Sequence, residues 1–492
     1  MMEEQAIIRS LIASSPEILA IVGACFILIG SLFMGRRLGV LLTISSLVVV
    51  LLCAIVTLGV LESQQAVYGG SFIMDPFAIF FKCLIFLATA LTILMSGRYL
   101  EQENIVEGEY HVLILFAMTG MMIMVSGTDL LVIYMGLELQ SICFYVLVGF
   151  RRQVVGSNEA ALKYVILGAV SSGIFLYGLS LVYGLTGSTQ LSEITSVFIQ
   201  SSKQDPMLIL AVIFLVVGLL FKVGAVPLHM WVPDVYEGAP TPITAFLSVG
   251  SKAAAFAILL RILMDSLASL SEIWIDIVIV IAVATMALGS FVALAQSNIK
   301  RMLAYSSIAH AGFALLGIIA GGEQGVTSVM LYLLIYTFMN FGLFSIVIMM
   351  QKQGPRADEI YAYTGLAASH PVWAFLTLIF LFSMAGIPPT AGFFAKFYVL
   401  LALLEEGYVW IAVIAVLLSA VAAYFYLRII MLMYMKKPID DFKLSLTPAL
   451  ILVLLLTGIG TVGIGLAPDW FLAQAQAAFF SDTVIVSSAT GP

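Results

Sequence analysis

Long apolar segments, separated by short polar connections, make up most of the chain. A helix needs about 20 predominantly apolar residues to cross a bilayer, and all of its backbone polar groups must be satisfied inside the membrane. Of the 492 residues, 62% are hydrophobic and only 10% are charged, which is too few to cover a soluble protein of this size. The sequence therefore predicts an all-α integral membrane protein.

We predict about fourteen transmembrane helices from the apolar segments. Their expected ranges are 18–34, 38–60, 77–96, 110–126, 130–150, 160–185, 207–230, 241–263, 277–295, 302–320, 326–350, 371–401, 409–435 and 449–466. No connection is long enough for a soluble domain, so residues 1–492 should form a single polytopic membrane domain. We divide it into N-terminal helices (18–96), two repeats (110–263 and 277–435) and a last helix (449–466).

Two of the predicted helices contain proline near their middle, Pro227 in the seventh and Pro388 and Pro389 in the twelfth. Proline removes a backbone donor and clashes with the preceding turn, so each helix should open there. If spans four to eight and nine to thirteen are two five-helix repeats, each break falls on the fourth helix of its repeat. Paired interrupted helices indicate the transport site of repeat-built transporters, although a packing kink is the alternative for either one.

Apart from Arg261 and Arg428 near helix ends, six charged residues fall inside the predicted spans: Glu138, Lys82, Lys163, Lys222, Lys252 and Lys396. A charge at the bilayer centre costs about 2.5–3.5 kcal/mol, so these side chains should line a hydrated interior and pair with acids. A buried lysine can take up and release a proton, because burial disfavours its charged form. We expect a proton relay in which Glu138 pairs with Lys163, with Glu159 one turn away on the same helix face.

Snorkelling of a lysine head to the membrane interface is the alternative to the relay, and it is strongest for Lys82, near the start of its helix. His229 and His310 also lie in or beside spans, where each is either a relay residue or a hydrogen-bonded structural residue. Lys396 follows Pro389 by seven residues and should begin a half-helix. The positive dipole end of that half-helix should favour proton loss from Lys396.

Charges in the connections sort to two sides when fourteen helices alternate in direction. One side collects most of the basic residues, namely Arg36, Arg37, Arg98, Arg151, Arg152, Lys300, Arg301, Lys352, Arg356, Lys436, Lys437 and Lys443. Because basic residues stay on the cytoplasmic side, both termini should face outwards.

No motif for a metal, nucleotide or redox cofactor accompanies these residues. The four cysteines lack C-x-x-C spacing, and the G-x-G-x-x-G match at residues 458–463 lies in the last apolar span and does not follow a strand. No basic stripe suits nucleic acid. We therefore expect no cofactor, no metal and no redox chemistry in this chain itself.

Six stretches resemble the subunit N family of proton-pumping NADH:quinone oxidoreductase, respiratory complex I, whose mitochondrial form is subunit 2. They are residues 134–141, 157–164, 221–231, 233–238, 298–308 and 385–397. The resemblance implies an antiporter-like fold of two inverted five-helix repeats in which helices seven and twelve are broken. It also implies that Glu138 and Lys163 are a coupled pair, that Lys222 and Lys252 form the middle of the relay, and that Lys396 is its outlet.

The same resemblance implies a membrane-arm subunit of a translocating enzyme in a bacterial inner membrane. Its expected partners are subunits K and M as neighbours, subunit J nearby, and lipids. FMN and iron–sulfur clusters should lie in partner subunits, with quinone as the substrate of the whole complex. Leu137 precedes Glu138, where subunits L and M usually have tryptophan, and Lys396 stands where subunit M has glutamate.

Three alternatives remain open at this point. The chain could be a subunit of a multisubunit cation/proton antiporter that works without electron transfer. It could be the same subunit in the ferredoxin-driven photosynthetic relative of complex I, because residues 157–164 and 250–254 are also similar to that form. It could also be a purely structural membrane scaffold, in which case neutralising the interior lysines would leave pumping intact.

Overall fold

The structure, a computed structural model, describes residues 2–33, 39–60, 66–103, 105, 107–350, 358–438 and 444–488. Of the predicted basic side, Arg36, Arg37, Lys352, Arg356 and Lys443 lie outside the described residues. The described chain is almost entirely helical and contains isolated β-bridges but no β-strand. The all-α prediction is therefore confirmed.

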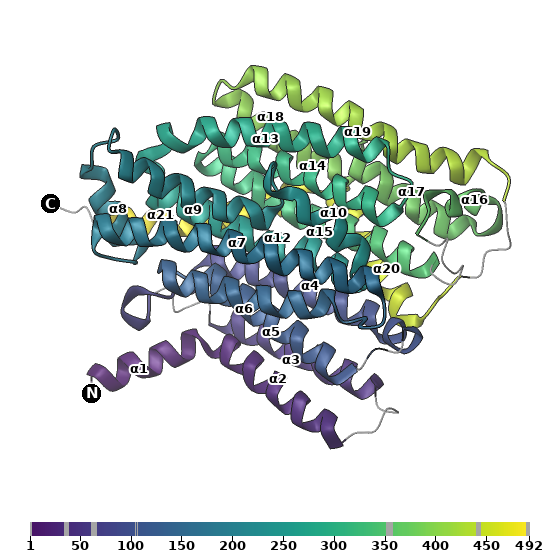
Figure 1. The fold of residues 1–492 in the computed structure, drawn as a ribbon, viewed down its shortest axis with the longest axis horizontal. Coiled ribbons are helices and arrows are strands. Elements are labelled where there is room, and N and C mark those ends of the chain that lie inside the picture. The colour runs from purple at the N-terminus through teal and green to yellow at the C-terminus, as the bar shows by residue number, and fades with distance from the viewer. Residues whose placement is uncertain are drawn as a thin grey trace.

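The helices that cover the predicted spans run side by side as one bundle (Figure 1). In chain order they are α2 (Ser15–Phe33), α3 (Gly39–Gly59), α4 (Pro76–Gln102), α5 (Glu107–Ser126), α6 (Leu130–Val148), α7 (Val155–Thr186), α9 (Pro206–Val223) with α10 (Trp231–Gly238), α11 (Thr241–Phe246) with α12 (Lys252–Arg261), α13 (Ser271–Leu294), α14 (Ile299–Ala320), α15 (Gly322–Met350), α17 (Pro371–Ala385) with α18 (Ala391–Glu405), α19 (Val409–Met435) and α20 (Pro448–Leu466). Among the described residues, 13 helical segments are long and apolar enough to cross a membrane. The two short helices α17 and α18 together supply the remaining predicted span, so the chain is an integral membrane protein with the predicted spans.

Apart from the four-residue helix α16 (Leu366–Ser369), three further helices were not predicted, because none of them contains a long apolar run. They are α1 (Met2–Ala13), α8 (Leu191–Gln200) and α21 (Pro468–Ser488). All three lie at the same end of the bundle, on the left in Figure 1. α21 packs against α4 and α15, and thus joins the N-terminal helices to the second repeat.

Polar side chains fix the starting points of several spans. The N-cap side chains that accept a backbone N–H are Asp75, Asp129, Asp205, Asn298 and Thr447. The first N–H groups of a helix have no partner within it, so a capping oxygen stabilises that end.

Matching backbone contacts relate the two halves of the bundle. Asp129 at the start of α6 forms a β-bridge with Gln190 after α7, and Asn298 at the start of α14 forms one with Glu359 after α15. Each bridge is flanked by two backbone hydrogen bonds of 2.7–3.0 Å. Likewise, α5 packs along α6 as α13 packs along α14. These contacts support the prediction that residues 110–263 and 277–435 are repeats.

Both predicted helix breaks are present. α9 ends at Val223 and α17 ends at Ala385, and each is followed by a glycine with positive φ, 76° at Gly224 and 85° at Gly386. Glycine is favoured there because a side chain is strained in the left-handed conformation. The chain resumes as α10 and α18, so each break exposes backbone carbonyls in the interior of the bundle.

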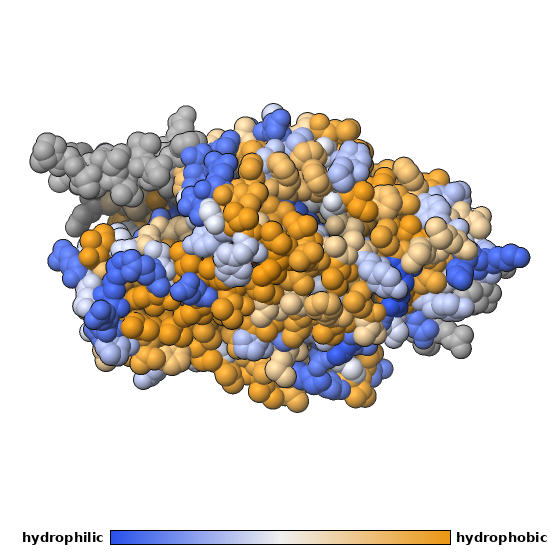
Figure 2. Space-filling view, turned by 90° about the horizontal axis from the view of Figure 1, so that it is seen from above, coloured by the Kyte–Doolittle hydropathy of each residue, from blue (hydrophilic) through white to orange (hydrophobic). Residues whose placement is uncertain are grey.

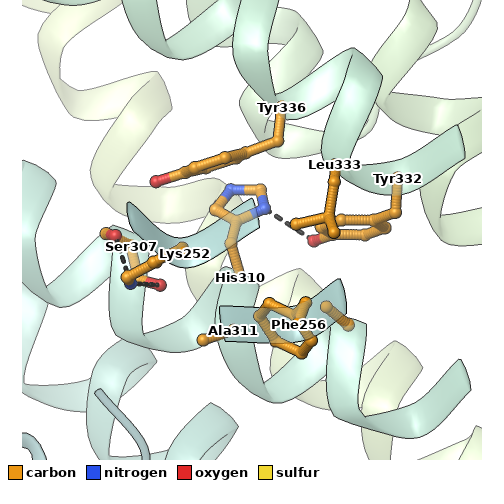
Figure 3. A pocket seen from close by; sticks show the side chains of 9 residues that line it. Lys252, Phe256, Ser307, His310, Ala311, Tyr332, Leu333 and Tyr336 are labelled. Carbon is orange, nitrogen blue, oxygen red and sulfur yellow. Dashed lines mark hydrogen bonds between the residues drawn. The ribbon is translucent and has the colours of Figure 1, made fainter. Parts of the chain in front are cut away.

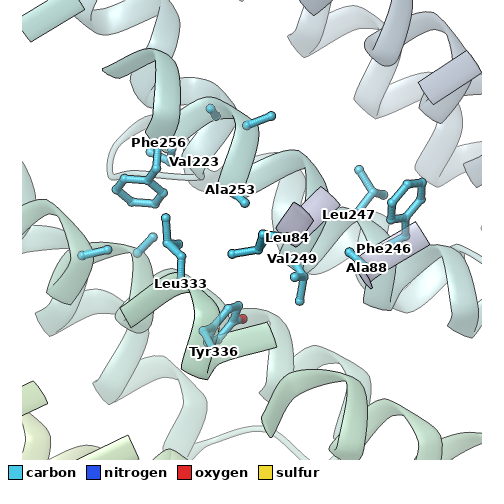
Figure 4. Packing of buried hydrophobic residues seen from close by; sticks show 14 of the residues in the cluster. Leu84, Ala88, Val223, Phe246, Leu247, Val249, Ala253, Phe256, Leu333 and Tyr336 are labelled. Atoms are coloured by element: carbon cyan, nitrogen blue, oxygen red, sulfur yellow. The ribbon is translucent and has the colours of Figure 1, made fainter. Parts of the chain in front are cut away.

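Apolar residues dominate the middle of the face in Figure 2, whereas hydrophilic residues gather mainly towards its ends, as expected for a chain surrounded by lipid. Inside the bundle, Leu84 and Ala88 of α4 belong to the same apolar cluster as Val249 and Leu333 (Figure 4). This packing surrounds the polar residues described next.

Candidate functional site

Four of the residues predicted to carry protons lie in the interior of the bundle. The exposed fraction is 2% for Lys222, 2% for Lys252, 5% for His310 and 7% for Lys396. A lysine this deeply buried cannot place its head in the membrane interface, so snorkelling is excluded for the three lysines.

Lys222 lies in the last turn of α9, directly before the first break. Its Nζ donates a hydrogen bond to Ser141 Oγ of α6 at 2.8 Å. Glu138 lies one turn before Ser141 on the same face of α6, and its carboxylate interacts electrostatically with Lys222. Glu138 also accepts a hydrogen bond from Ser172 of α7. Helices α6, α7 and α9 therefore bring one acid and one lysine into the same polar group.

Lys163 does not form the predicted pair with Glu138. Its Nζ lies 2.8 Å from Asp234 and 2.7 Å from Glu159. Ser172, which contacts Glu138, stands nine residues further along α7, which is roughly 14 Å along the helix axis. That separation is too long for the two side chains to bridge, so the Glu138–Lys163 pair is absent from this structure.

The partner of Lys163 belongs to an ion-pair cluster that the sequence reasoning missed. Asp234 and Glu237, both on the short helix α10, each lie 2.8 Å from Arg301 Nη1 of α14. The cluster connects α7, α10 and α14, and thus holds the second half of the broken span against both repeats. The sequence signal for this cluster was a pair of acidic residues, Asp234 and Glu237, three residues apart and shortly after the first helix break.

Lys252 begins α12, directly after a π-helical turn at Leu247–Ser251. Its Nζ donates to the backbone oxygen and the Oγ of Ser307, at 2.9 and 2.6 Å. A Cβ on Gly224 would lie 3.9 Å from this Nζ, so the ammonium stands beside the first break. Gln140 of α6 donates to the last residue of the π-helical turn at 3.3 Å, which links this region to the Glu138 group.

His310 lies one turn after Ser307 on α14 and connects the Lys252 region to the second repeat (Figure 3). Its Nδ1 is 2.6 Å from the Tyr332 hydroxyl and its Nε2 is 3.2 Å from the Tyr426 hydroxyl. Lys252, Ser307, His310 and Tyr332 line part of a small cavity between them. Its volume of about 10 Å³ is room for roughly one water molecule.

Lys396 faces the second break. Its Nζ donates to the backbone oxygens of Met384 and Ala385 at 3.2 and 2.9 Å, and to Ser419 Oγ at 2.9 Å. Those carbonyls are the C-terminal end of α17, whose partial negative charge stabilises a cation. The side chain thus extends back to α17, and the influence of the positive end of α18 on this lysine stays a prediction.

Helix α14 reaches Lys396 as well. The Nζ of Lys396 lies 5.2 Å from the ring centre of Phe313, which is one turn after His310. One helix thus carries the acceptor for Lys252, the central histidine and a ring that contacts Lys396.

His229 stands apart from this group. It lies in the short 3-10 turn Leu228–Met230 after the first break, and its buried Nδ1 has no hydrogen-bond partner among the described residues. A relay role for His229 stays a prediction.

Two further buried ion pairs join the N-terminal part of α4 to other helices. Lys82 pairs with Glu17 of α2 at 2.5 Å, so it does not snorkel. Arg261, which the sequence placed at a helix end, is buried and donates to both carboxylate oxygens of Asp75 at 3.0 Å. In the part of the chain that the structure describes, no group of three or more histidine, cysteine or acidic side chains is placed to hold a metal ion.

A membrane bundle with two broken spans, each flanked by a buried lysine, defines the class of antiporter-like ion-translocating subunits. Residues 127–422 match the family described as NADH:quinone oxidoreductase/Mrp antiporter, TM. The chain is 57% identical over 479 residues to NADH-quinone oxidoreductase subunit N 2 of Rhizobium meliloti, covering 97% of this chain and 100% of the relative. It is 43% identical over 465 residues to subunit N of Rhodospirillum rubrum, covering 94% and 96% of the two chains. The chain therefore belongs to the subunit N family of NADH-quinone oxidoreductase.

Solved structures agree with this assignment. A chain of respiratory complex I from Thermus thermophilus with bound aureothin has a TM-score of 0.76 and 29% identity, covering 92% of this chain and 98% of that one. A chain of the Mrp complex from Dietzia sp. DQ12-45-1b has a TM-score of 0.83 at 21% identity, covering 96% and 97%, and thus shares the fold.

Proposed function

We propose that this chain translocates protons as a membrane-arm subunit of NADH-quinone oxidoreductase. Electron transfer from NADH to quinone takes place elsewhere in the complex and drives proton movement through this subunit. FMN and iron–sulfur clusters belong to partner subunits. The relatives named NADH-quinone oxidoreductase subunit N support this function and this electron donor.

The observation that carries the proposal is a polar series along the bundle, in which three lysines and His310 are buried. It runs from Glu138 and Lys222, through Lys252 and His310, to Lys396. Each of its lysines stands beside a helix break. Lys222 and Lys252 donate hydrogen bonds to Ser141 and Ser307, and Lys396 donates to the carbonyls freed at the second break. A proton can be passed along such a series when neighbouring side chains change partners in turn.

In this relay, Glu138 stabilises the protonated form of Lys222, and Lys252 exchanges a proton with the Ser307–His310 segment of α14. Lys396 is the outlet. Lys163 instead belongs to the ion-pair cluster with Asp234, from which it orients the second half of span seven. A role of Lys163 in the relay stays a prediction.

Partner subunits are expected to cover part of the outer surface of α6. Glu138 is only half-buried, and its neighbours Met135 and Ile142 on α6 are exposed. An ionised carboxylate at mid-membrane is costly in lipid, so a neighbouring protein surface is favoured there. Subunits K and M as neighbours, with J nearby, fit this need. We place the complex in the bacterial inner membrane with both termini outside.

Reconstitution tests the proposal. The complex carrying Lys252→Met should assemble and retain its redox centres, but proteoliposomes should show little NADH-driven proton uptake. Normal uptake in this variant would refute the relay. Copurification with other antiporter subunits, without a flavin-containing arm, would favour the alternative of a multisubunit cation/proton antiporter.

A further inference from the structure

Another buried lysine, Lys82, lies outside the relay and has its own set of partners. It is completely buried and pairs at 2.5 Å with Glu17, whose side chain is 5% exposed. Its Nζ also donates to Met74 Sδ at 3.1 Å and lies 5.1 Å from the ring centre of Phe72. None of these residues belongs to the series that contains Lys222, Lys252 and Lys396.

The pair is separated from the relay by the geometry of α4. Leu84 stands two residues after Lys82, roughly 200° around the helix, and Ala88 lies on a similar side. Both belong to the apolar cluster next to α12 (Figure 4). Helix α4 thus turns apolar side chains towards the relay and its lysine towards α2.

The helices that the pair joins to α4 are exposed over most of their surface, although α2 packs along α5, and α3 packs along α4 and α5. Only 28% of the α2 span and 22% of the α3 span are buried, against 72% for α4. In Figure 1 these two helices lie at one edge of the bundle. In lipid, apolar surfaces gain no hydrophobic stabilisation by meeting, so packing and polar contacts decide whether such helices stay attached.

We propose that the Glu17–Lys82 ion pair is the docking site that holds the N-terminal hairpin, α2 and α3, against the antiporter-like core, and that it carries no protons. Removing one partner leaves a buried charge without its counter-ion, which is strongly destabilising, whereas replacing both partners by neutral residues of similar shape is mild. A relay pair would behave differently, because the double replacement would also abolish proton transfer.

A native thiol reports on the docking. Cys53 of α3 is fully buried, and its Sγ donates to the backbone oxygen of Pro16 at 3.4 Å, one residue before Glu17. Cys53 also interacts electrostatically with Lys82 of α4, so it lies where α2, α3 and α4 meet, and detachment of the hairpin from α4 would expose this thiol. The experiment uses the assembled complex in native membranes, with the other three cysteines, Cys25, Cys83 and Cys143, replaced. A membrane-permeant maleimide then measures the labelling rate of Cys53.

Lys82→Met alone should raise the labelling rate by about ten-fold or more, or leave little assembled subunit. The double variant Glu17→Gln/Lys82→Met should restore slow labelling, assembly and normal proton translocation. The matched control neutralises the exposed pair Lys203–Glu272, which lies 3.0 Å apart, and should change neither readout.

Three results would overturn the docking role. In the first, the single variant assembles normally and protects Cys53 as well as the wild type. In the second, the double variant labels as fast or assembles as poorly as the single one. In the third, the double variant protects Cys53 but fails to translocate protons, which would make Lys82 a relay residue.

Discussion

Replacing Lys396 with arginine separates the charge of this residue from its ability to release a proton. The three acceptors around Nζ are two carbonyls at the end of α17 and Ser419 Oγ. A guanidinium has enough donors for all three, and Gly386 presents no side chain against the stem of residue 396. Lys396→Arg should therefore assemble.

The size of the functional loss follows from the chemistry of the two cations. The reference pKa of arginine exceeds that of lysine by about 2 units or more, so its neutral form is roughly 100-fold rarer at a given pH. The carbonyl acceptors favour a cation in either case and do not remove this difference. If the outlet step requires a neutral side chain, proton translocation should fall by about ten-fold to 100-fold.

The assay is NADH-driven acidification of proteoliposomes containing the purified complex, read with a pH-sensitive dye and normalised to assembled complex. Lys300→Arg is the matched control, because Lys300 is also buried but forms an ion pair with Asp358 at 3.1 Å outside the relay. This control should pump normally. Normal pumping by Lys396→Arg, together with loss in Lys396→Ala, would show that only the charge matters and would refute the relay role.

Three further predictions concern the first repeat. Glu138→Gln should lower proton translocation by about ten-fold with assembly intact, since the electrostatic partner of the nearby lysine is lost while its hydrogen bond can persist; unchanged pumping would contradict this. Double-mutant cycles on the yield of assembled complex should show coupling between Lys163 and Asp234 and none between Lys163 and Glu138. The reverse result would support the Glu138–Lys163 pair predicted from the sequence. On intact cells, an impermeant thiol reagent should label Glu193→Cys but not Arg152→Cys, and the opposite pattern would invert the topology.

The apolar runs and the two proline breaks were sufficient to predict the spans. Both signals are local in the sequence, because backbone N–H and C=O groups must form hydrogen bonds within each helix in lipid. Lys222, Lys252 and Lys396 could be selected for the same reason, since any charge inside a span must be explained. The additional helix α21 could not be predicted in this way. Its stability comes from packing on α4 and α15, which a count of apolar residues does not detect.

Partner assignments were the least predictable part of the site. Lys163 was matched to the only acid inside a span, but its true partner, Asp234, comes from the short helix after a break, and its position depends on how that helix folds back. Glu17 lies just before the first predicted span, and only the fold places it against Lys82. Contacts between helices depend on the tertiary structure, which a single sequence does not reveal directly.

The two helix breaks have the same backbone geometry, but different side chains donate hydrogen bonds to the carbonyls near each break. At the first break, the indole nitrogen of Trp231 donates to the backbone oxygen of Phe221 at 3.0 Å. At the second, the donor is the ammonium of Lys396. An indole N–H keeps its hydrogen at every physiological pH, whereas an amine has three donors when charged and two when neutral. The hydrogen bond at the first break is therefore independent of pH, whereas the hydrogen bonds at the second break depend on whether Lys396 carries its proton.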